Sequence, residues 1–406
     1  MKTFEIPEFY RSPLISLIKN KRKMDDKLKK DFIPTLLDFD SIEIYLARHF
    51  GFCYGVENAI EIAFRTVSEN PNKRIFLLSE MIHNPQVNAD LVRSGVRFIM
   101  DTVGKMYIKW EDLTKEDIVI IPAFGTTLET EKRLIDIGIN PLQYNTTCPF
   151  VEKVWNRSEQ IGNKGYTIII HGKPKHEETR ATFSHSSSNA PSVVVKNLEE
   201  AKNLKKYIEK TCDLDEFYHE FEGQYSQGFD IHKDLEKIGV VNQTTMLASD
   251  TQTIADYLKN VMLEQYSLDA SNTSTRFADT RDTLCYATND NQSAVKGLLD
   301  INADFAIVVG GYNSSNTSHL VELCEEKLPT YFIENDSKIF SKNEIAHYDL
   351  HSHSEKLSTH YFPENKKPSI LITSGASCPD AVVEKVILKL ISFFEDAKSI
   401  DSFLNK

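Results

Sequence analysis

The chain has 406 residues, of which 41% are hydrophobic and 26% are charged, with a formal net charge of −12. This length suits two or three domains of ordinary size. A net acidic chain is poorly suited to neutralising nucleic-acid phosphates, so DNA and RNA are not expected as partners. There is no apolar run of about 18 residues, so no membrane span is expected.

The N-terminal segment, residues 1–45, is predicted to be a helical extension that covers the first domain. It has no apolar region of the kind that a secretory signal needs. Its basic run at 19–23 is soon followed by Asp25, Asp26 and Asp31, whereas organelle transit peptides are poor in acidic residues. The six scattered cysteines are too few for a disulfide framework and fit a reducing cytosol. We therefore expect a cytoplasmic protein.

From about residue 46 onward, short runs rich in Ile and Val alternate with amphipathic segments. Such runs suit strands that are buried on both faces of a parallel sheet, and their alternation with helices predicts an α/β protein with several small parallel sheets. Strands are expected at residues 74–79, 117–123, 166–171, 192–196, 238–242, 305–310, 330–334 and 369–373. Helices are expected at residues 57–68, 129–137, 198–210, 251–264, 318–327 and 380–394.

Two stretches interrupt this alternation. Residues 211–236 are acidic and aromatic and are interpreted as an insertion. Residues 336–367 are polar and contain four histidines, namely His347, His351, His353 and His360. Because the histidine spacing is irregular and no cysteine lies among them, a solvated loop is favoured over a metal site.

Three isolated cysteines, Cys53, Cys148 and Cys285, each precede a segment with helical periodicity. A helix N-terminus stabilises a thiolate, and without any CxxC pair the zinc-ribbon, thioredoxin and ferredoxin patterns are poor matches. Three thiolates brought together by the fold could hold a four-iron cluster and leave one iron without a protein ligand, free to bind substrate. A buried cysteine can also be inert packing, and this is our interpretation of Cys324 and Cys378. Cys212 lies at the edge of the first insertion.

Polar loops follow three of the predicted strands, at residues 242–245, 311–318 and 374–380. Backbone N–H groups and hydroxyls converge where such a strand leads into a helix, which favours a phosphate or diphosphate pocket. Ser, Thr, Asn and Asp are also ordinary helix caps, so each loop taken alone has a purely structural explanation.

Two histidine motifs supply acid–base candidates. His83 follows one strand, and His176 and Glu178 follow another, two residues apart. This spacing would place both side chains on one side of an extended segment or on a turn. The histidine could then bind an anion and the carboxylate could relay a proton. A solvated charged loop is the alternative.

Together these motifs resemble the 4-hydroxy-3-methylbut-2-enyl diphosphate reductase family from about residue 46 to residue 392. Seven motifs occur in the family's order: Gly-Phe-Cys-x-Gly-Val, Thr-Cys-Pro, His-x-Glu, Gln-Thr-Thr, Cys-Tyr-Ala-Thr, Asn-Ser-Ser-Asn and Gly-Ala-Ser-x-Pro-Asp. The resemblance implies the last step of the methylerythritol phosphate route to isoprenoids. In that step the substrate's hydroxyl is removed reductively to give isopentenyl and dimethylallyl diphosphate.

The resemblance also implies a set of site residues. One [4Fe-4S] cluster per subunit would be held by Cys53, Cys148 and Cys285. Glu178 would relay protons, with the hydroxyl of Thr244 as its partner near the substrate. The positions implied to hold the diphosphate or the substrate's hydroxyl end are His83, His176, Thr244, Ser314, Ser315, Asn316 and Ser377. A single-electron donor of the ferredoxin or flavodoxin type is implied as a partner.

The fold that the resemblance implies is three small α/β domains in a pseudo-threefold, trefoil arrangement around a central iron–sulfur cluster. Each domain would contribute one cysteine. With the N-terminal extension and a C-terminal helix and tail, the expected divisions are 1–45, 46–148, 149–280, 281–380 and 381–406, with the insertions inside the third and fourth.

One position departs from the common pattern. Many bacterial members have Ala-His-Gly where this chain has Ala123-Phe124-Gly125, and Phe124 cannot donate the histidine's hydrogen bond to a diphosphate. That contact must be missing or replaced. The same stretch resembles the plant and cyanobacterial branch, while the N-terminus favours a bacterial cytoplasmic enzyme. The alternatives are a quinolinate-synthase-like cluster enzyme, a non-catalytic iron–sulfur sensor and a structural zinc protein.

Overall fold

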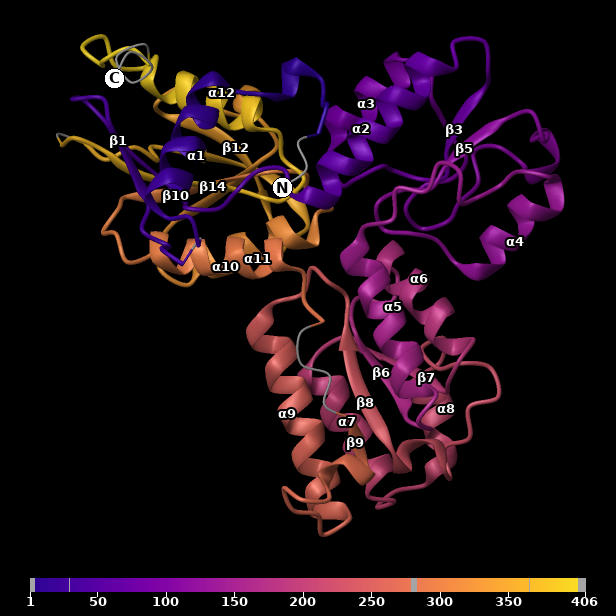
Figure 1. The fold of residues 1–406 in the computed structure, drawn as a ribbon. Coiled ribbons are helices and arrows are strands. Elements are labelled where there is room, and N and C mark those ends of the chain that lie inside the picture. The colour runs from indigo at the N-terminus through magenta and orange to yellow at the C-terminus, as the bar shows by residue number, and fades with distance from the viewer. Residues whose placement is uncertain (1–3, 29, 279–282, 365, 401–406) are drawn as a thin grey trace. The chain divides into compact units, whose positions relative to one another are not determined.

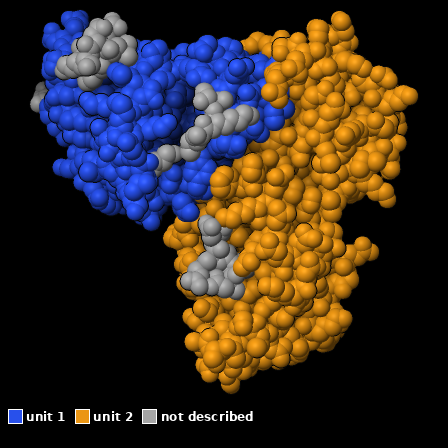
Figure 2. All heavy atoms as spheres, in the orientation of Figure 1, with its two compact units in different colours: residues 1–64, 82–90, 286–406 blue, residues 65–81, 91–285 orange. Residues whose placement is uncertain are grey.

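The computed structural model describes residues 4–28, 30–278, 283–364 and 366–400. It divides into two compact units (Figure 2). Unit 1 contains residues 1–64, 82–90 and 286–406, and unit 2 contains residues 65–81 and 91–285. The predicted domain divisions stay a prediction, and the one placed at residues 280 and 281 falls outside the described residues.

The sheet of unit 1 has seven strands in the order β1-β2-β14-β10-β11-β12-β13. Their bounds are β1 Thr35–Asp38, β2 Glu43–Leu46, β10 Phe305–Val309, β11 Thr330–Ile333, β12 Glu344–Asp349, β13 Ser354–Thr359 and β14 Ser369–Ser374. The central strands β2, β14, β10 and β11 are parallel, whereas β1, β12 and β13 pair antiparallel. The three strands predicted here are confirmed, and they form the parallel centre of a sheet whose outer strands are antiparallel.

Helices cover both faces of this sheet, with α1 and α12 on one side and α10 and α11 on the other (Figure 1). The bounds are η1 Glu8–Tyr10, α1 Pro13–Asp25, α10 Tyr286–Leu298, α11 Ser315–Glu325, η6 Asp336–Lys338 and α12 Asp380–Ile391. The helix predicted in the N-terminal extension is confirmed at α1, but the later part of the extension forms β1 and most of β2. Ser12 caps α1 by accepting the Ile15 N–H at 2.9 Å, and Pro13 occupies the first helical position, which tolerates proline.

The solvated loop predicted at 336–367 is wrong, because β12 and β13 form a hairpin there. His347 lies on β12, and its Nε2 is 2.8 Å from the Ser358 hydroxyl on the facing strand. Tyr348 stacks on Tyr312 with ring centroids 4.6 Å apart. β12 buries Ile345 alone and β13 buries none of its residues, so neither strand shows the hydrophobic alternation by which a strand is recognised.

Unit 2 contains two parallel sheets, ordered β4-β3-β5 and β7-β6-β8-β9. The bounds are β3 Ile75–Leu77, β4 Arg97–Phe98, β5 Ile118–Ile120, β6 Thr167–His171, β7 Ser192–Val195, β8 Ile238–Asn242 and β9 Phe277–Ala278. All five strands that were predicted for this unit are confirmed. Strands β4 and β9 have only two residues each, too few for a sequence pattern to reveal.

The four-stranded sheet is covered on both faces, which explains its uninterrupted Ile and Val runs. Ile169 of β6 packs with the helices α7 and α9, whereas Ile168 and Ile170 pack with α5. The bounds of the elements in this unit are η2 Trp110–Asp112, α4 Leu128–Ile137, α5 Pro149–Gly162, α6 Glu177–Ser187, α7 Leu198–Ile208, η3 Leu214–Glu216, α8 Phe217–Glu220, η4 Asp234–Glu236, α9 Ala248–Gln265 and η5 Thr273–Thr275. The remaining helices, α2 Tyr54–Glu69 and α3 Pro85–Arg93, begin in unit 1 and end in unit 2.

The segment 211–236, interpreted as an insertion, contributes an aromatic cluster to the core of unit 2. Phe217 is fully buried and stacks on Phe221 and Phe229, with ring centroids 5.0 and 5.1 Å apart. Cys212 packs at the edge of this cluster. None of the helices that the described residues form is long and apolar enough to cross a membrane.

Candidate functional site

The three cysteines of interest all stand at the starts of helices, as predicted. Cys53 precedes α2, and its carbonyl accepts the Glu57 N–H at 2.9 Å, the first hydrogen bond of that helix. Cys148 is the N-cap residue of α5 and is followed by proline at the first helical position. Cys285 directly precedes α10. None of the three forms a disulfide with another cysteine of the described residues.

In unit 1, the Cys53 segment is tied to the loop that follows β14. The Cys53 N–H donates to the Ala376 carbonyl at 3.2 Å, and the Tyr54 N–H donates to the Tyr286 hydroxyl at 3.3 Å. Burial raises the pKa of the Cys53 thiol, although nearby backbone N–H groups lower it. This direction is opposite to the helix-dipole expectation, so the thiol is protonated at neutral pH and a metal would have to displace its proton.

The loops after β10 and β14 approach each other so closely that only glycine fits at the contact. The two strands are parallel neighbours, so both loops leave the same edge of the sheet. A Cβ on Gly375 would lie 1.9 Å from the Thr317 hydroxyl, and one on Gly310 would lie 2.7 Å from the same atom. Ser314 caps α11 and accepts the hydroxyl of Thr317 at 2.9 Å. Thr317 therefore joins the two predicted anion loops.

The orientation of the Asn316 side-chain amide is fixed by hydrogen bonds to its oxygen. Its Oδ1 accepts the Ala376 N–H at 3.0 Å and the Asn291 amide at 3.4 Å. Its Nδ2 is consequently directed elsewhere, and this buried atom has no hydrogen-bond partner among the residues that the structure describes. Buried donors are nearly always paired in folded proteins, so an unpaired one suggests an absent acceptor.

His83 and Ser377 belong to the same region of unit 1. The Ser377 hydroxyl donates to the His83 carbonyl at 3.2 Å, and a Cβ on Gly311 would lie 2.5 Å from that carbonyl oxygen. The structure thus brings together most of the anion-binding positions predicted in this unit. The buried members are His83, Ser314, Ser315, Asn316 and Ser377.

In unit 2, Glu178 and His176 are placed by the first turn of α6. His176 is the N-cap residue, and its Nδ1 accepts the Glu178 N–H at 3.2 Å. A neutral imidazole that accepts at Nδ1 carries its proton on Nε2, where it can donate to an anion. The Glu178 carboxylate is buried and accepts the Thr244 N–H at 2.5 Å. The predicted extended segment or turn is therefore a helix start.

The sequence did not single out the side chain of Gln243, which organises the neighbouring loop. Its Oε1 accepts the Lys173 N–H at 3.1 Å and the Thr179 hydroxyl at 2.9 Å, while its Nε2 donates to the Thr245 hydroxyl at 2.7 Å. The residue is fully buried. The sequence did contain one indication of this role. Gln243 is a glutamine within a hydroxyl-rich loop that follows a buried strand.

Phe124 packs against the site instead of donating to it. Its ring meets the His176 ring edge-on, with centroids 5.6 Å apart and planes at 85°. The Cys148 N–H donates to the carbonyl of the adjacent Ala123 at 2.9 Å, and the Cys285 N–H reaches the Thr244 carbonyl at 3.4 Å. Unit 2 therefore carries Cys148 and Cys285 on loops that adjoin Phe124 and Thr244.

A stacked pair holds the loop after Phe124. Trp155 and His185 lie face to face, with centroids 3.7 Å apart and planes at 9°, and His185 Nε2 donates to the Thr126 carbonyl at 3.2 Å. Gly125 has a φ of 75°, and a Cβ there would lie 2.5 Å from the Trp155 ring. Burial lowers the pKa of His185. No sequence motif indicated this pair.

Two of the other cysteines are packed in the interior of unit 1. Cys324 and Cys378 are fully buried, and burial raises the pKa of each thiol to about 12. The prediction that Cys324 belongs to the core is confirmed. Cys378, beside Ser377, has the surroundings expected of a packing residue.

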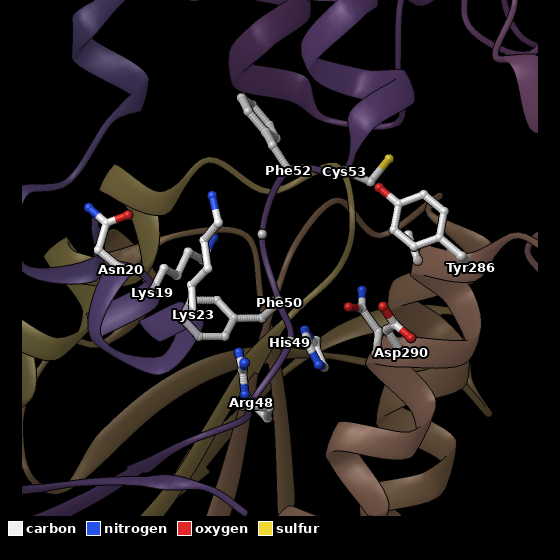
Figure 3. A pocket seen from close by; sticks show the side chains of 13 residues that line it. Lys19, Asn20, Lys23, Arg48, His49, Phe50, Phe52, Cys53, Tyr286 and Asp290 are labelled. Atoms are coloured by element: carbon white, nitrogen blue, oxygen red, sulfur yellow. The ribbon is translucent and has the colours of Figure 1, made fainter. Parts of the chain in front are cut away.

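A pocket of about 240 Å³ in unit 1 reaches Cys53 (Figure 3). Lys19, Lys23 and Arg48 lie on one side of the segment from Phe50 to Cys53, and residues of α10 lie on the other. The lining is therefore cationic on the side of α1.

Comparison with known proteins gives a consistent match. The LytB protein family model matches residues 44–391. The 4-hydroxy-3-methylbut-2-enyl diphosphate reductase of Picosynechococcus sp. is 41% identical over 352 residues, covering 86% of this chain and 84% of the relative. The protein of the same name from Prochlorococcus marinus (strain AS9601) is 40% identical over 382 residues, covering 92% and 93%.

Two solved structures are similar. One is described as (E)-4-hydroxy-3-methyl-but-2-enyl diphosphate reductase, the terminal enzyme of the non-mevalonate pathway; it has a TM-score of 0.52 and 25% identity and covers 86% of this chain and 99% of that one. The E-1-hydroxy-2-methyl-but-2-enyl-4-diphosphate reductase from Plasmodium falciparum has a TM-score of 0.62 and 21% identity, covering 86% and 87%. The second likeness concerns the fold alone.

Proposed function

The chain belongs to the LytB protein family, and from this premise we propose that it reduces 4-hydroxy-3-methylbut-2-enyl diphosphate to isopentenyl and dimethylallyl diphosphate. This reaction is the final step of the methylerythritol phosphate pathway. It replaces a C–O bond with a C–H bond, consumes two electrons and two protons, and releases one water. The observation that carries the proposal is the family match, which spans both units and includes every candidate residue.

The family consists of iron–sulfur oxidoreductases, and the proposal assigns one [4Fe-4S] cluster per subunit to Cys53, Cys148 and Cys285. The donor set fits, because all three cysteines stand at helix starts, none forms a disulfide among the described residues, and no CxxC pair competes for the metal. When bound, the cluster supplies the two electrons one at a time, together with an iron that has no protein ligand. Cluster binding would remove the proton from Cys53, whose thiol is otherwise kept neutral by burial.

The loops of unit 1 would bind the diphosphate. Asn316 Nδ2 is buried without a partner, and its orientation is fixed through Oδ1, so it is ready to donate to a phosphate oxygen. Hydroxyls of Ser314, Ser315 and Ser377 lie in the same region at the carboxyl edge of the sheet. Fixing the diphosphate orients the reacting end and excludes water, which lowers the entropic cost of reaction.

Residues of unit 2 would supply protons and would help to orient the substrate. Hydroxide is a poor leaving group, so the departing oxygen needs a proton, and Glu178 would deliver it with the Thr244 hydroxyl as its partner. His176 would donate from Nε2 to the substrate. Phe124 provides no hydrogen bond, but it packs on the His176 ring and so limits that ring's rotation.

An external one-electron donor of the ferredoxin or flavodoxin type would reduce the enzyme. We propose that the enzyme is cytoplasmic.

Turnover assays after anaerobic purification test the proposal. Reduced methyl viologen and 4-hydroxy-3-methylbut-2-enyl diphosphate should yield both five-carbon diphosphates. A cluster-loaded protein that forms neither product would overturn the assignment, and the sensor interpretation would then remain. A quinolinate-synthase-like enzyme would instead condense and dehydrate its substrates without an external reductant.

A further inference from the structure

The N-terminal extension contacts the residues on both sides of Cys53, within unit 1. Lys19 of α1 bonds both oxygens of Asp380, at 2.7 and 2.9 Å, and lies over the Phe50 ring at 4.8 Å. The ring of Tyr10 meets Phe52 edge-on at 5.7 Å. Since these contacts fix α1 against the Cys53 loop, whatever binds the outer surface of α1 is held beside that loop.

Glycine at position 51 is what allows this close packing. Its φ is 79°, and a Cβ there would lie 2.3 Å from Asp380 Oδ1 and 2.9 Å from Lys19 Nζ. The Lys19–Asp380 pair therefore sits directly on the backbone two residues before Cys53. Lys19 is occupied by this pairing and is not available to a partner.

Other cations of the same segment are available. Residues 11–30 contain eight lysines and arginines but only two aspartates, in a chain whose net charge is −12. Arg22 pairs with Asp31 at 2.7 Å. Lys21 and Lys23 are exposed and form no ion pair with any residue in the described part of the chain. The outer surface of α1 is thus locally basic on an acidic protein.

The pocket described above leads from this basic surface to Cys53. Lys23 and Arg48 line it on the α1 side, and Cys53 and Tyr286, which lie close to each other, line another part (Figure 3). Arg48 is buried, and its Nε has no hydrogen-bond partner among the described residues. Lys23 and Arg48, whose guanidinium lies 3.9 Å from Asp26, thus place positive charge on the α1 side of the pocket, while Asp290 lines the α10 side. The pocket joins this cationic side to a residue that the proposed function makes a cluster ligand.

We propose that the basic surface of α1 is the docking site for an acidic one-electron carrier protein, with electrons entering the cluster on the Cys53 side. The inference rests on the proposed function, because that reaction requires two electrons from outside. Each encounter would deliver one electron from the carrier to the enzyme, so two encounters and two protons would complete one turnover. One proton would leave with the hydroxyl as water and the other would form the new C–H bond. Unlike charges steer such encounters and raise their association rate.

The test compares Lys21→Glu/Lys23→Glu with Lys202→Glu/Lys259→Glu, a control that makes the same change in charge at exposed lysines of unit 2. The electron source is an acidic [2Fe–2S] ferredoxin kept reduced enzymatically. At low salt, the first variant should raise the KM for ferredoxin about tenfold and the control should not. At about 0.5 M NaCl the difference should largely disappear, because salt screens exposed charges.

Turnover with reduced methyl viologen separates this inference from the proposed function. The α1 variant should keep wild-type viologen activity and iron–sulfur absorbance. Equal ferredoxin KM values for the two double variants would overturn the docking site and leave the reductase assignment intact. If charge reversal impairs folding, Lys21→Gln/Lys23→Gln should give an intermediate KM, and a wild-type value would again contradict the inference.

Discussion

The backbone N–H of Thr244 donates to Oε1 of Glu178 at 2.5 Å, and both residues are buried. This bond joins the start of α6 to the loop after β8 through a backbone donor, which fixes one oxygen of the carboxylate. A carboxylate has several acceptor sites, so it can also take up and pass on a proton. The geometry matches the proton-relay role that we propose for Glu178.

Replacing Glu178 with Gln should reduce turnover by about two orders of magnitude or more, the scale of a lost proton-transfer group. The amide keeps the shape of the side chain, so iron–sulfur absorbance should be unchanged. Glu177→Gln is the matched control, because Glu177 is also buried on α6 but its carboxylate pairs with Ser79. Steady-state assays with reduced viologen provide the comparison, and full activity in Glu178→Gln would reject the assignment.

Asn316→Asp should raise the KM for the diphosphate substrate about tenfold or more, since hydrogen bonds to charged groups are worth about 1.5–3 kcal/mol. The variant replaces the unpaired Nδ2 donor with an oxygen and adds negative charge. Asn197→Asp makes the same chemical change at an exposed N-cap of α7 and should leave KM unchanged. An unchanged KM in Asn316→Asp would show that the buried amide serves packing only.

Cys285→Ser should lose the iron–sulfur absorbance, because a neutral hydroxyl replaces a thiolate ligand. Cys212→Ser should keep it, since Cys212 packs beside the aromatic cluster. Anaerobic reconstitution followed by absorbance and iron analysis measures the effect. Retention of both cluster and activity in Cys285→Ser would contradict the three-ligand arrangement.

Gly375→Ala should destabilise the protein by about 1–3 kcal/mol and weaken diphosphate binding, because the added Cβ would collide with the Thr317 hydroxyl. Adding Thr317→Ala removes that hydroxyl and should recover part of the lost stability. Denaturant unfolding of the single and double variants measures the coupling. Strictly additive losses would indicate that the two loops relax independently.

Acidification should lower the stability of the protein partly through His185. Burial lowers the pKa of this histidine below its ordinary value of about 6.5, so the unfolded state binds the proton first as pH falls. The free energy of unfolding therefore decreases from about pH 6.5 down to the folded pKa. His185→Gln should show a smaller drop in Tm between pH 7.5 and 5.5 than wild type, whereas His219→Gln, at an exposed position, should match wild type.

The parts of the fold that local pattern determines could be predicted from the sequence. Ile168, Ile169 and Ile170 lie in a strand buried on both faces, and such a strand needs no tertiary information to be recognised. The helix start at Cys148 was visible because proline follows it. The β12–β13 hairpin was missed, since almost all of its side chains are exposed or half-buried and no hydrophobic face marks its strands.

The candidate site could likewise be predicted only in part from the sequence. The order of the motifs indicated Glu178 and Asn316 as site residues. It could not show that the Asn316 amide is fixed by Ala376, sixty residues away. The Gln243 network and the Trp155–His185 stack depend on contacts between segments distant in the chain. Contacts between distant segments produce no periodic pattern in the sequence, so only the structure reveals which residues hold the loops in place.

The central claim is that three cysteines hold a four-iron cluster and leave one iron without a protein ligand. Mössbauer spectroscopy of anaerobically reconstituted, ⁵⁷Fe-labelled protein tests it most directly. We expect about four iron atoms per chain, with one iron site spectroscopically distinct from the other three. Four equivalent irons, or zinc in place of iron, would contradict it.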